Sequence, residues 1–340
     1  MTFVEVASFD VVHAGLSWPW LAFDSSGERF AFAASDRLIA TRVLNDDEKV
    51  VDGPSIALPA DLSLPSVRAF SIDVSGTLLA IAATAAIAGT TETASVIVTC
   101  DADGERCRST MDKLAGPGFN ARAVTFDRSG TRLWISAESE TETALLLIDA
   151  RSHALVGIAR SAVFPPPATH ELYLHPQDDA VLLLAACGEA GTFARVVGWS
   201  GEGVETIPTA LDGGSISAGF VGFSADAARV HLAEADELRT HAWPELHELS
   251  SVELADDFVA SYAGAVIGHH IYVDGAEADS GDDAVMRFDR SAIRGRLLPL
   301  PVPEGMWAGR LGADLIVTVE SKGDPARGRV IRVATPGTSN

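Results

Sequence analysis

The amino-acid sequence predicts an all-β fold built from repeated units, and three observations lead to this expectation. A short strand, a tight polar turn and a second short strand recur in three closely matching stretches, residues 21–33, 70–82 and 124–136. The same strand–turn–strand shape continues in four more divergent stretches, residues 172–184, 221–233, 261–273 and 307–319. No stretch of any length shows the apolar period of an amphipathic helix. Seven similar β units are therefore expected.

The spacing and content of the units are typical of propeller blades. From Gly27 to Gly312, the turn positions of the first and last units, six intervals span 285 residues (312 − 27), about 47 residues each. The units continue with further β-like runs, such as residues 38–44, 94–100, 144–149 and 193–199. Four strands in each of seven units predict a seven-bladed β-propeller of four-stranded antiparallel blades.

One propeller domain over residues 1–340 is expected, closed by its own amino terminus. Residues 3–12 read as a strand that precedes the first unit, whereas the last unit supplies only three strands, at 307–310, 314–320 and 330–333. The first strand would complete the last blade and remove an exposed sheet edge. The predicted blades are approximately 14–60, 61–114, 115–163, 164–210, 211–254, 255–300 and 301–337, the last one together with residues 3–12.

The repeated turn has a structural chemistry of its own. Asp24 can accept hydrogen bonds from the backbone of its own turn, and Gly27 permits a positive φ. Because Asp73 with Gly76 and Asp127 with Gly130 repeat this pair, we interpret the motif as a hairpin and not as an active site.

The first unit resembles a blade of the WD-repeat or lactonase-like propellers, in residues 13–27, Ser35-Asp36 and 38–43. In WD-repeats a His, a Ser or Thr, an Asp and a Trp form a buried hydrogen-bonded network, so the resemblance implies His13 and Asp36 as members here. The closing Trp-Asp pair of that family is missing from every unit. Lactonase-like propellers hold a metal in the central channel through acidic and Asn residues. Only Asn120 of the three asparagines lies near the predicted channel mouth.

Composition limits the partners. The net charge is 25 − 47 = −22, which repels phosphate backbones and anionic membrane surfaces, so neither nucleic acid nor a membrane is expected as a partner. A basic protein or peptide fits better; alternatively, the charge only keeps the protein soluble. Three lysines against abundant Arg and Ala indicate a GC-rich bacterial genome. The first residues lack a secretion signal, and a cytoplasmic location is expected.

The three cysteines cannot build a disulfide framework. Cys100 and Cys107 flank the turn at residues 101–106 and could face each other across a hairpin, with the reduced pair preferred in a cytosolic protein. Cys187 reads as a small buried apolar residue.

One face of the predicted propeller combines acidic loops with aromatic and cationic side chains. Carboxylates gather between the second and third strands of several blades, and aromatics and cations gather between blades. An acidic rim around an aromatic centre suits a basic, partly apolar peptide. In the alternative interpretation the loop charges are merely solvated and the aromatics pack between blades. The candidate partner-binding residues are Trp18, Trp20, Arg68, Phe119, Arg122, His170, Phe258, Trp307, Glu138, Glu140, Asp236 and Asp279.

The other clusters favour structural interpretations. Residues 274–283 contain five carboxylates, whose oxygens suit Ca²⁺, but their spacing matches no calcium loop and a mobile acidic loop is favoured. His269 and His270 are adjacent on a predicted strand, so their side chains point to opposite faces and cannot share a metal. His231 is expected to be packed or to line the channel. No phosphate-binding glycine loop, zinc-spaced cluster or nucleophile elbow is present. The sequence therefore predicts no catalytic residue, no metal ligand and no cofactor.

The sequence thus favours a non-catalytic propeller that binds a basic protein or peptide, as a scaffold or regulatory subunit. The alternative is a lactonase-like, metal-dependent hydrolase with its site in the central channel. A carbohydrate-binding propeller is a third option, against which the six tryptophans count, because they do not occupy one equivalent position in the repeats.

Overall fold

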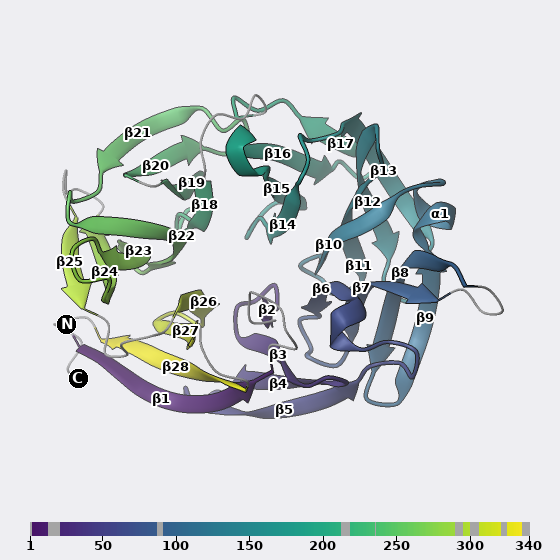
Figure 1. The fold of residues 1–340 in the computed structure, drawn as a ribbon, viewed down its shortest axis with the longest axis horizontal. Helices are drawn as coiled ribbons and strands as arrows, with labels where there is room; N and C mark the ends of the chain where they lie inside the picture. The colour runs from purple at the N-terminus through teal and green to yellow at the C-terminus, as the bar shows by residue number, and fades with distance from the viewer. Residues whose placement is uncertain are drawn as a thin grey trace.

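A computed structural model shows a ring of seven four-stranded antiparallel sheets (Figure 1). The structure describes residues 2–12, 21–86, 91–211, 218–234, 236–289, 295–299, 306–320 and 325–334. The predicted fold class, a seven-bladed β-propeller, is confirmed. The first strand of each blade lies nearest the ring centre: β2 (Leu21–Phe23), β6 (Val67–Ile72), β10 (Asn120–Phe126), β14 (Thr169–Leu174), β18 (Ala218–Phe223), β22 (Phe258–Ile267) and β26 (Met306–Leu311).

The remaining strands follow in order toward the outside of the ring. The second strands are β3 (Arg29–Ser35), β7 (Leu79–Ala86), β11 (Arg132–Glu138), β15 (Ala180–Ala186), β19 (Arg229–Glu234), β23 (His270–Glu277) and β27 (Leu315–Val319). The third strands are β4 (Leu38–Leu44), β8 (Thr93–Asp101), β12 (Glu142–Asp149), β16 (Thr192–Trp199), β20 (Glu237–Ala242), β24 (Asp283–Asp289) and β28 (Ala326–Ala334). The outermost strands are β5 (Val50–Ala57), β9 (Gly104–Thr110), β13 (Leu155–Ala162), β17 (Val204–Ile207), β21 (Glu248–Glu253), β25 (Arg296–Pro299) and β1 (Thr2–Val11).

Helical structure in the described residues is confined to three short segments between strands. They are α1 (Met111–Leu114) and the single 3₁₀ turns η1 (Leu64–Ser66) and η2 (Gly188–Ala190). No helix in this part of the chain has the length and apolar character needed to cross a membrane.

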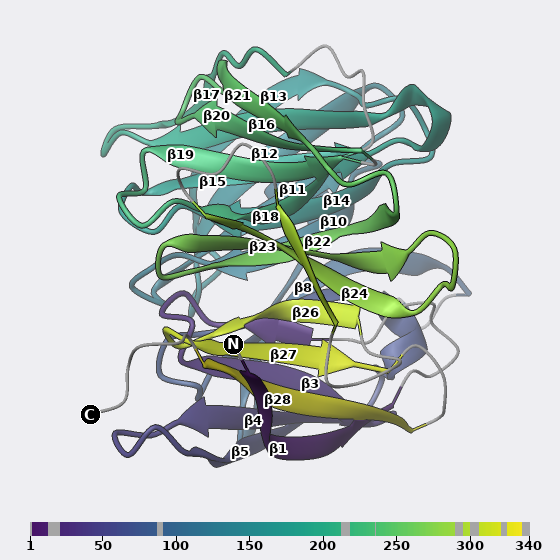
Figure 2. The ribbon, with the colours of Figure 1, turned by 90° about the vertical axis from the view of Figure 1, so that its left-hand side faces the viewer.

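The amino-terminal strand closes the ring, as the sequence predicts. β1 pairs antiparallel with β28 from Thr2 opposite Ala334 to Val11 opposite Ala326, and the sheet order is β1-β28-β27-β26 (Figure 2). Phe9 and Val11 of β1 are buried in one apolar cluster with Phe30 and Phe32 of the first blade. The strand therefore joins the last blade by hydrogen bonds and the first blade by packing.

The core lies between neighbouring blades. The middle strands of two blades are covered on both faces: residues 79–83 of β7 and 143–148 of β12 are buried without interruption. The outermost strands face solvent on one side and are polar, as in β21, where five of six residues are exposed. Burial of both faces of a blade thus requires both of its neighbours.

The repeated turn adopts the predicted hairpin geometry. In blade 3, the buried Asp127 carboxylate accepts hydrogen bonds from the backbone N–H groups of Thr131 and Arg132, each at 3.0 Å. Gly130 has a φ of 69°, and Gly27 and Gly76 have φ values of 70° and 73°. Asp24 and Asp73 accept the equivalent backbone hydrogen bonds.

Blades 4 and 5 keep the turn with different side chains. In blade 4, the His175 imidazole accepts from the backbone N–H of Asp178 at 2.7 Å, in place of a carboxylate. In blade 5, the Ser224 hydroxyl accepts from the backbone N–H of Arg229 at 3.1 Å, and Ala227 has the positive φ, 58°, of the missing glycine. The chemistry of the turn is therefore retained where the sequence repeat has faded.

The turns of neighbouring blades are also joined to one another. Some links use side chains that reach the next turn and others use backbone groups. They are Arg29 to the Val74 carbonyl, the Phe126 N–H to the Ser71 hydroxyl, Arg132 to Asp179, His175 to the Ala227 carbonyl, Arg310 to the Val266 carbonyl, and the Gly312 N–H to the Gly27 carbonyl. These links tie the blades together at one end of the ring.

Two other expectations concern the first two blades. Asp36 is exposed and contributes its backbone carbonyl to the Leu64 N–H, so it takes no part in a buried side-chain network of the WD-repeat kind; His13 lies outside the described residues. Cys100 pairs with Glu105 and Cys107 with Thr99 across the β8–β9 hairpin, so the two thiols are offset by one register step. All three cysteines are free, and burial raises the pKa of Cys100 to about 12.

We predict that Asp127→Ala lowers the free energy of unfolding by about 2–4 kcal/mol, because it removes several charge-assisted hydrogen bonds and leaves part-buried backbone donors without a partner. Urea unfolding measures the effect. Asp47→Ala, in an exposed turn of blade 1 where the carboxylate approaches Lys49 only to 3.9 Å, should change the value by less than about 0.5 kcal/mol. Equal small losses in both variants would contradict this role for the buried turn carboxylate.

Candidate functional site

The candidate site lies at the end of the ring that carries the inter-blade connections and the loops between second and third strands. We call this end the loop face, and the opposite end, with its first-to-second-strand and third-to-fourth-strand connections, the turn face. Because the strands of each blade are antiparallel, the first strand begins and the second strand ends at the loop face. Several predicted site residues occupy these positions.

Three of the predicted residues meet at blades 3 and 4. Arg122 of β10 places its Nε 3.4 Å from Oε2 of Glu138, the last residue of β11. His170 of β14 places Nε2 3.3 Å from the same oxygen, and its Nδ1 lies 2.6 Å from the hydroxyl of Ser136. The cluster therefore links the second strand of blade 3 to the first strand of blade 4.

Burial controls the charges in this cluster. It raises the pKa of Glu138, against the opposing effect of Arg122, and it lowers the pKa of His170 to about 4, with Arg122 and Arg195 acting in the same direction. His170 is therefore neutral at physiological pH. Neither Glu138 Oε2 nor His170 Nε2 has a hydrogen-bond partner within the described residues. The exposed Arg122 is the charged group closest to Glu138.

Blade 5 carries a carboxylate at the equivalent position. Glu234 is the last residue of β19 and is 4% exposed, and Arg239 of β20 approaches it at 3.1 Å. Arg239 also contacts Glu237 at 2.8 Å and Glu248 at 3.2 Å. Burial raises the pKa of Glu234 to about 7, because one arginine shared among three carboxylates compensates only part of the lost solvation.

Blade 6 buries a third carboxylate between itself and blade 7. Asp274 of β23 accepts hydrogen bonds from the Ser261 hydroxyl at 2.8 Å and from the backbone N–H of Trp307 at 3.2 Å. Burial raises its pKa to about 7, although both hydrogen bonds oppose the shift. These contacts hold blades 6 and 7 together.

The predicted aromatic centre is packed inside the protein. Phe119, Phe258 and Trp307 are 7%, 4% and 3% exposed. Arg160 lies over the Phe119 ring at 5.0 Å, and Trp307 stacks on Tyr272 at 5.9 Å between ring centroids. The alternative interpretation, aromatics packed between blades, describes these three residues. Trp18 and Trp20 lie outside the described residues.

The other predicted residues remain at the surface. Arg68, Arg122, Glu140, Asp236 and Asp279 are all exposed. Sequence reasoning missed Ser136, Ser261 and Arg239, which orient or neutralise the buried carboxylates. Only Arg239 had a local signal, because it lies among the carboxylates of the 234–237 run.

The acidic segment at residues 274–283 is ordered as a hairpin, and the predicted mobile loop is wrong. β23 runs to Glu277 and β24 begins at Asp283, with backbone hydrogen bonds from Glu277 to Asp282 and from Gly281 to Glu277 closing the turn. The strand pairing of residues 274–276 with 283–285 stabilises this segment despite its charge. Within the described residues, no group of three or more His, Cys, Asp or Glu side chains is placed to hold a metal ion.

The predicted packing of His231 is observed, since it is buried and its Nδ1 lies 2.9 Å from the Thr240 hydroxyl. Four tryptophans are described, and they occupy different positions. Trp134 lies in β11, Trp199 ends β16, Trp243 follows β20 and Trp307 lies in β26. They form no repeated set of the kind expected for a carbohydrate-binding propeller.

We predict that Glu234→Gln raises the free energy of unfolding relative to the wild type by about 1 kcal/mol more at pH 8 than at pH 5. The folded pKa is about 7, above the unfolded value of 4.5, so the folded state binds the proton more tightly. The wild type therefore loses stability as pH rises through this window, and the glutamine does not. Urea unfolding at both pH values measures the difference.

Glu237→Gln provides the control of opposite sign. Hydrogen bonds from Ser251 and Arg239 lower the pKa of Glu237, so its ionised form stabilises the fold above its unfolded pKa. The glutamine variant should be slightly less stable than the wild type at both pH 5 and pH 8. A Glu234→Gln effect that is independent of pH would contradict the buried-carboxylate interpretation.

Comparisons with known proteins support the fold. No protein-family model matches the chain, and a search of curated proteins finds no match. Among solved structures, the chain is similar to the WD40 domain of SCAP from fission yeast, with a TM-score of 0.55 and 9% identity over 94% of this chain and 82% of that one. It is also similar to the β-propeller domain of Cps50 (Swd1) from Myceliophteria thermophila, with a TM-score of 0.56 and 10% identity over 96% of this chain and 100% of that one. The chain shares the β-propeller fold of these domains, and in this chain the ring has seven blades.

Proposed function

We propose that this propeller is a non-catalytic scaffold or regulatory subunit that binds a basic protein or peptide on its loop face, in a bacterial cytoplasm. The observation that carries the proposal is a division among the loop-face carboxylates. Glu138, Glu234 and Asp274 are buried and engaged within the fold, whereas Glu140, Asp236 and Asp279 are exposed. The exposed three have no side-chain partner within the described residues.

The exposed carboxylates lie on blades 3, 5 and 6, so they present negative charge around one end of the ring. Such a distribution raises the association rate of cationic partners and orients their approach. Asp274 supports it indirectly, because the hydrogen bond that it accepts from the Trp307 N–H joins blades 6 and 7. A surface fixed in this way loses little conformational entropy on binding.

Blade 6 adds an apolar contact within the acidic surface. Val259, near the start of β22, is 55% exposed, and the exposed Asp256 and Asp257 precede it. The hydrogen bond from the Ala278 N–H to the Asp257 carbonyl, at 2.8 Å, brings the turn that carries Asp279 beside them. A basic peptide with an apolar side chain matches this combination. Since Phe119, Phe258 and Trp307 are buried, the proposed anchor is Val259 and not the predicted aromatic centre.

We predict that the triple variant Glu140→Gln, Asp236→Asn and Asp279→Asn binds a Lys/Arg-rich peptide about tenfold more weakly than the wild type at low ionic strength, because local charge complementarity is lost. Fluorescence anisotropy with a labelled basic peptide, and with a Glu-rich peptide as a negative probe, measures the effect. The difference should shrink as salt is added.

A matched control separates the loop face from the total charge. Asp46→Asn, Glu202→Gln and Glu245→Gln remove three exposed carboxylates from the turn face, so both triple variants have the same net charge. The control variant should retain peptide affinity within about twofold. Equal weakening in the two variants would show that overall acidity, and not the loop face, attracts the peptide.

A further inference from the structure

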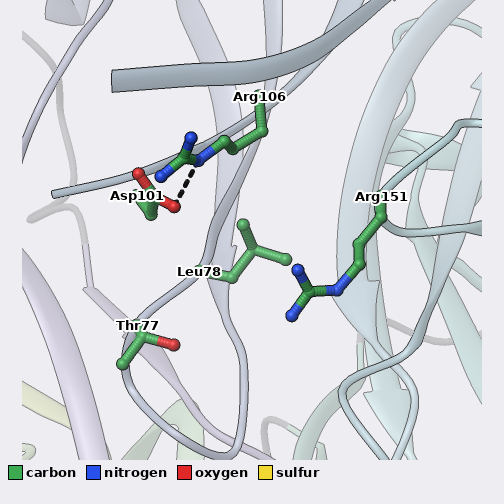
Figure 3. Close-up of a pocket in the computed structure, with 5 residues that line it drawn as sticks. All are labelled: Thr77, Leu78, Asp101, Arg106 and Arg151. Atoms are coloured by element: carbon green, nitrogen blue, oxygen red, sulfur yellow. Dashed lines mark hydrogen bonds and ion pairs between the residues drawn. The ribbon is translucent and has the colours of Figure 1, made fainter. Parts of the chain in front are cut away.

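A cavity of about 250 Å³ opens on the turn face between blades 2 and 3. Its lining comes from three connections that are distant in sequence: Thr77 and Leu78 from the β6–β7 turn, Asp101 and Arg106 from the β8–β9 hairpin, and Arg151 from the β12–β13 turn. Figure 3 shows the Arg151 guanidinium pointing toward Leu78, with Thr77 and the Arg106–Asp101 pair on the other side of Leu78 from Arg151.

The two arginines differ in their side-chain ion pairs. Arg106 is paired with Asp101 and, at 2.7 Å, with Asp103. Arg151 has no side-chain partner within the described residues. The neighbouring Asp149 carboxylate forms no ion pair with it; that carboxylate accepts from the backbone N–H groups of Arg151 at 3.1 Å and Ser152 at 2.8 Å. One guanidinium is thus left to face the cavity.

The walls of the cavity are fixed before any ligand arrives. The Asp149 hydrogen bonds hold the Arg151 turn, and the buried His153, with a φ of 54°, places Nε2 3.3 Å from the Thr99 hydroxyl of blade 2. On the other side, the Thr77 N–H donates to the Asp73 carboxylate at 2.9 Å. Blades 2 and 3 therefore hold the cavity in a defined shape.

We propose that this cavity binds a small organic monocarboxylate with a short apolar body. A planar carboxylate matches the fork of the Arg151 guanidinium. The Thr77 hydroxyl is not a donor to this ligand, because it pairs with the Ser75 hydroxyl at 2.6 Å. Leu78, which is 9% exposed, lines the cavity and is the apolar contact for the body of the ligand. The volume is below that of a typical drug-sized pocket of about 300–1,000 Å³, so the ligand is small.

The charges around the cavity favour a monoanion over a phosphate. Arg106 pairs with both Asp101 and Asp103, so with Arg151 the four charges sum to zero, and Arg151 is the cation among them without a paired carboxylate. A phosphate dianion would meet repulsion from both aspartates and would give nothing for Leu78 to contact. An amine would meet the Arg151 guanidinium. The site is on the opposite face of the ring from the proposed partner surface, so the two proposals stand or fall separately.

The test is a titration of the full chain with sodium butyrate at low ionic strength, followed through backbone amide signals in NMR spectra. Saturable shifts are expected at Thr77, Leu78, Arg151 and Ser152. Arg151→Ala should weaken binding at least about tenfold, since it removes the charge-assisted hydrogen bonds. Arg151→Lys should give an intermediate loss, because the charge remains but the planar fork is absent.

The controls test which ligand chemistry the cavity selects and whether binding occurs at Arg151. Arg229→Ala removes another exposed turn-face arginine whose side chain has no partner within the described residues, and it should leave butyrate affinity unchanged. Inorganic phosphate should bind at least about tenfold more weakly than butyrate, and n-butylamine should cause no saturable shift. Equal losses in Arg151→Ala and Arg229→Ala, phosphate binding as tight as butyrate binding, or the absence of saturable shifts at the cavity would each overturn the proposal.

Discussion

Every blade must bury both faces of its four-stranded sheet, and the rest of the structure depends on this constraint. A four-stranded sheet with apolar inner strands leaves two faces to cover, and only a neighbour on each side can cover them. Seven blades satisfy this requirement only if the last meets the first. β1 makes that contact, since it pairs with β28 and buries Phe9 against Phe30 and Phe32. Ring closure by one terminal strand therefore completes the core.

Polar groups follow the same plan at both ends of the ring. At the turn face, side chains such as Arg132 and His175 reach from one blade to the turn of the next. At the loop face, the buried Asp274 carboxylate joins two blades, because it accepts a hydrogen bond from the Trp307 N–H of the next blade. These polar groups are engaged within the fold, and the proposed functions use exposed side chains outside them, such as the loop-face carboxylates and Arg151. The proposed functions both use what the fold leaves unpaired.

The sequence predicted the fold better than the site, for physical reasons. The Asp–Gly turn is encoded within a few residues, so it identifies a blade even where Ala227 replaces glycine. Burial of a polar side chain instead depends on residues far away. Glu138 and His170 are both expected at the loop face, but the contacts of His170 with Glu138 and Ser136 require two blades to be assembled. The composition around Asp274 predicts a mobile loop, because the partners of Asp274, Ser261 and the Trp307 N–H, leave no local pattern.

Removal of residues 1–12 tests the central claim, closure of the ring by β1, most directly. The truncated chain would expose the edge of β28 and the apolar surface of the first blade that Phe9 and Val11 cover. Thermal unfolding followed by circular dichroism should show a transition at least about 10 °C lower than that of the full chain, and broader, because loss of closure weakens cooperativity. A sharp transition at the temperature of the full chain would contradict the account.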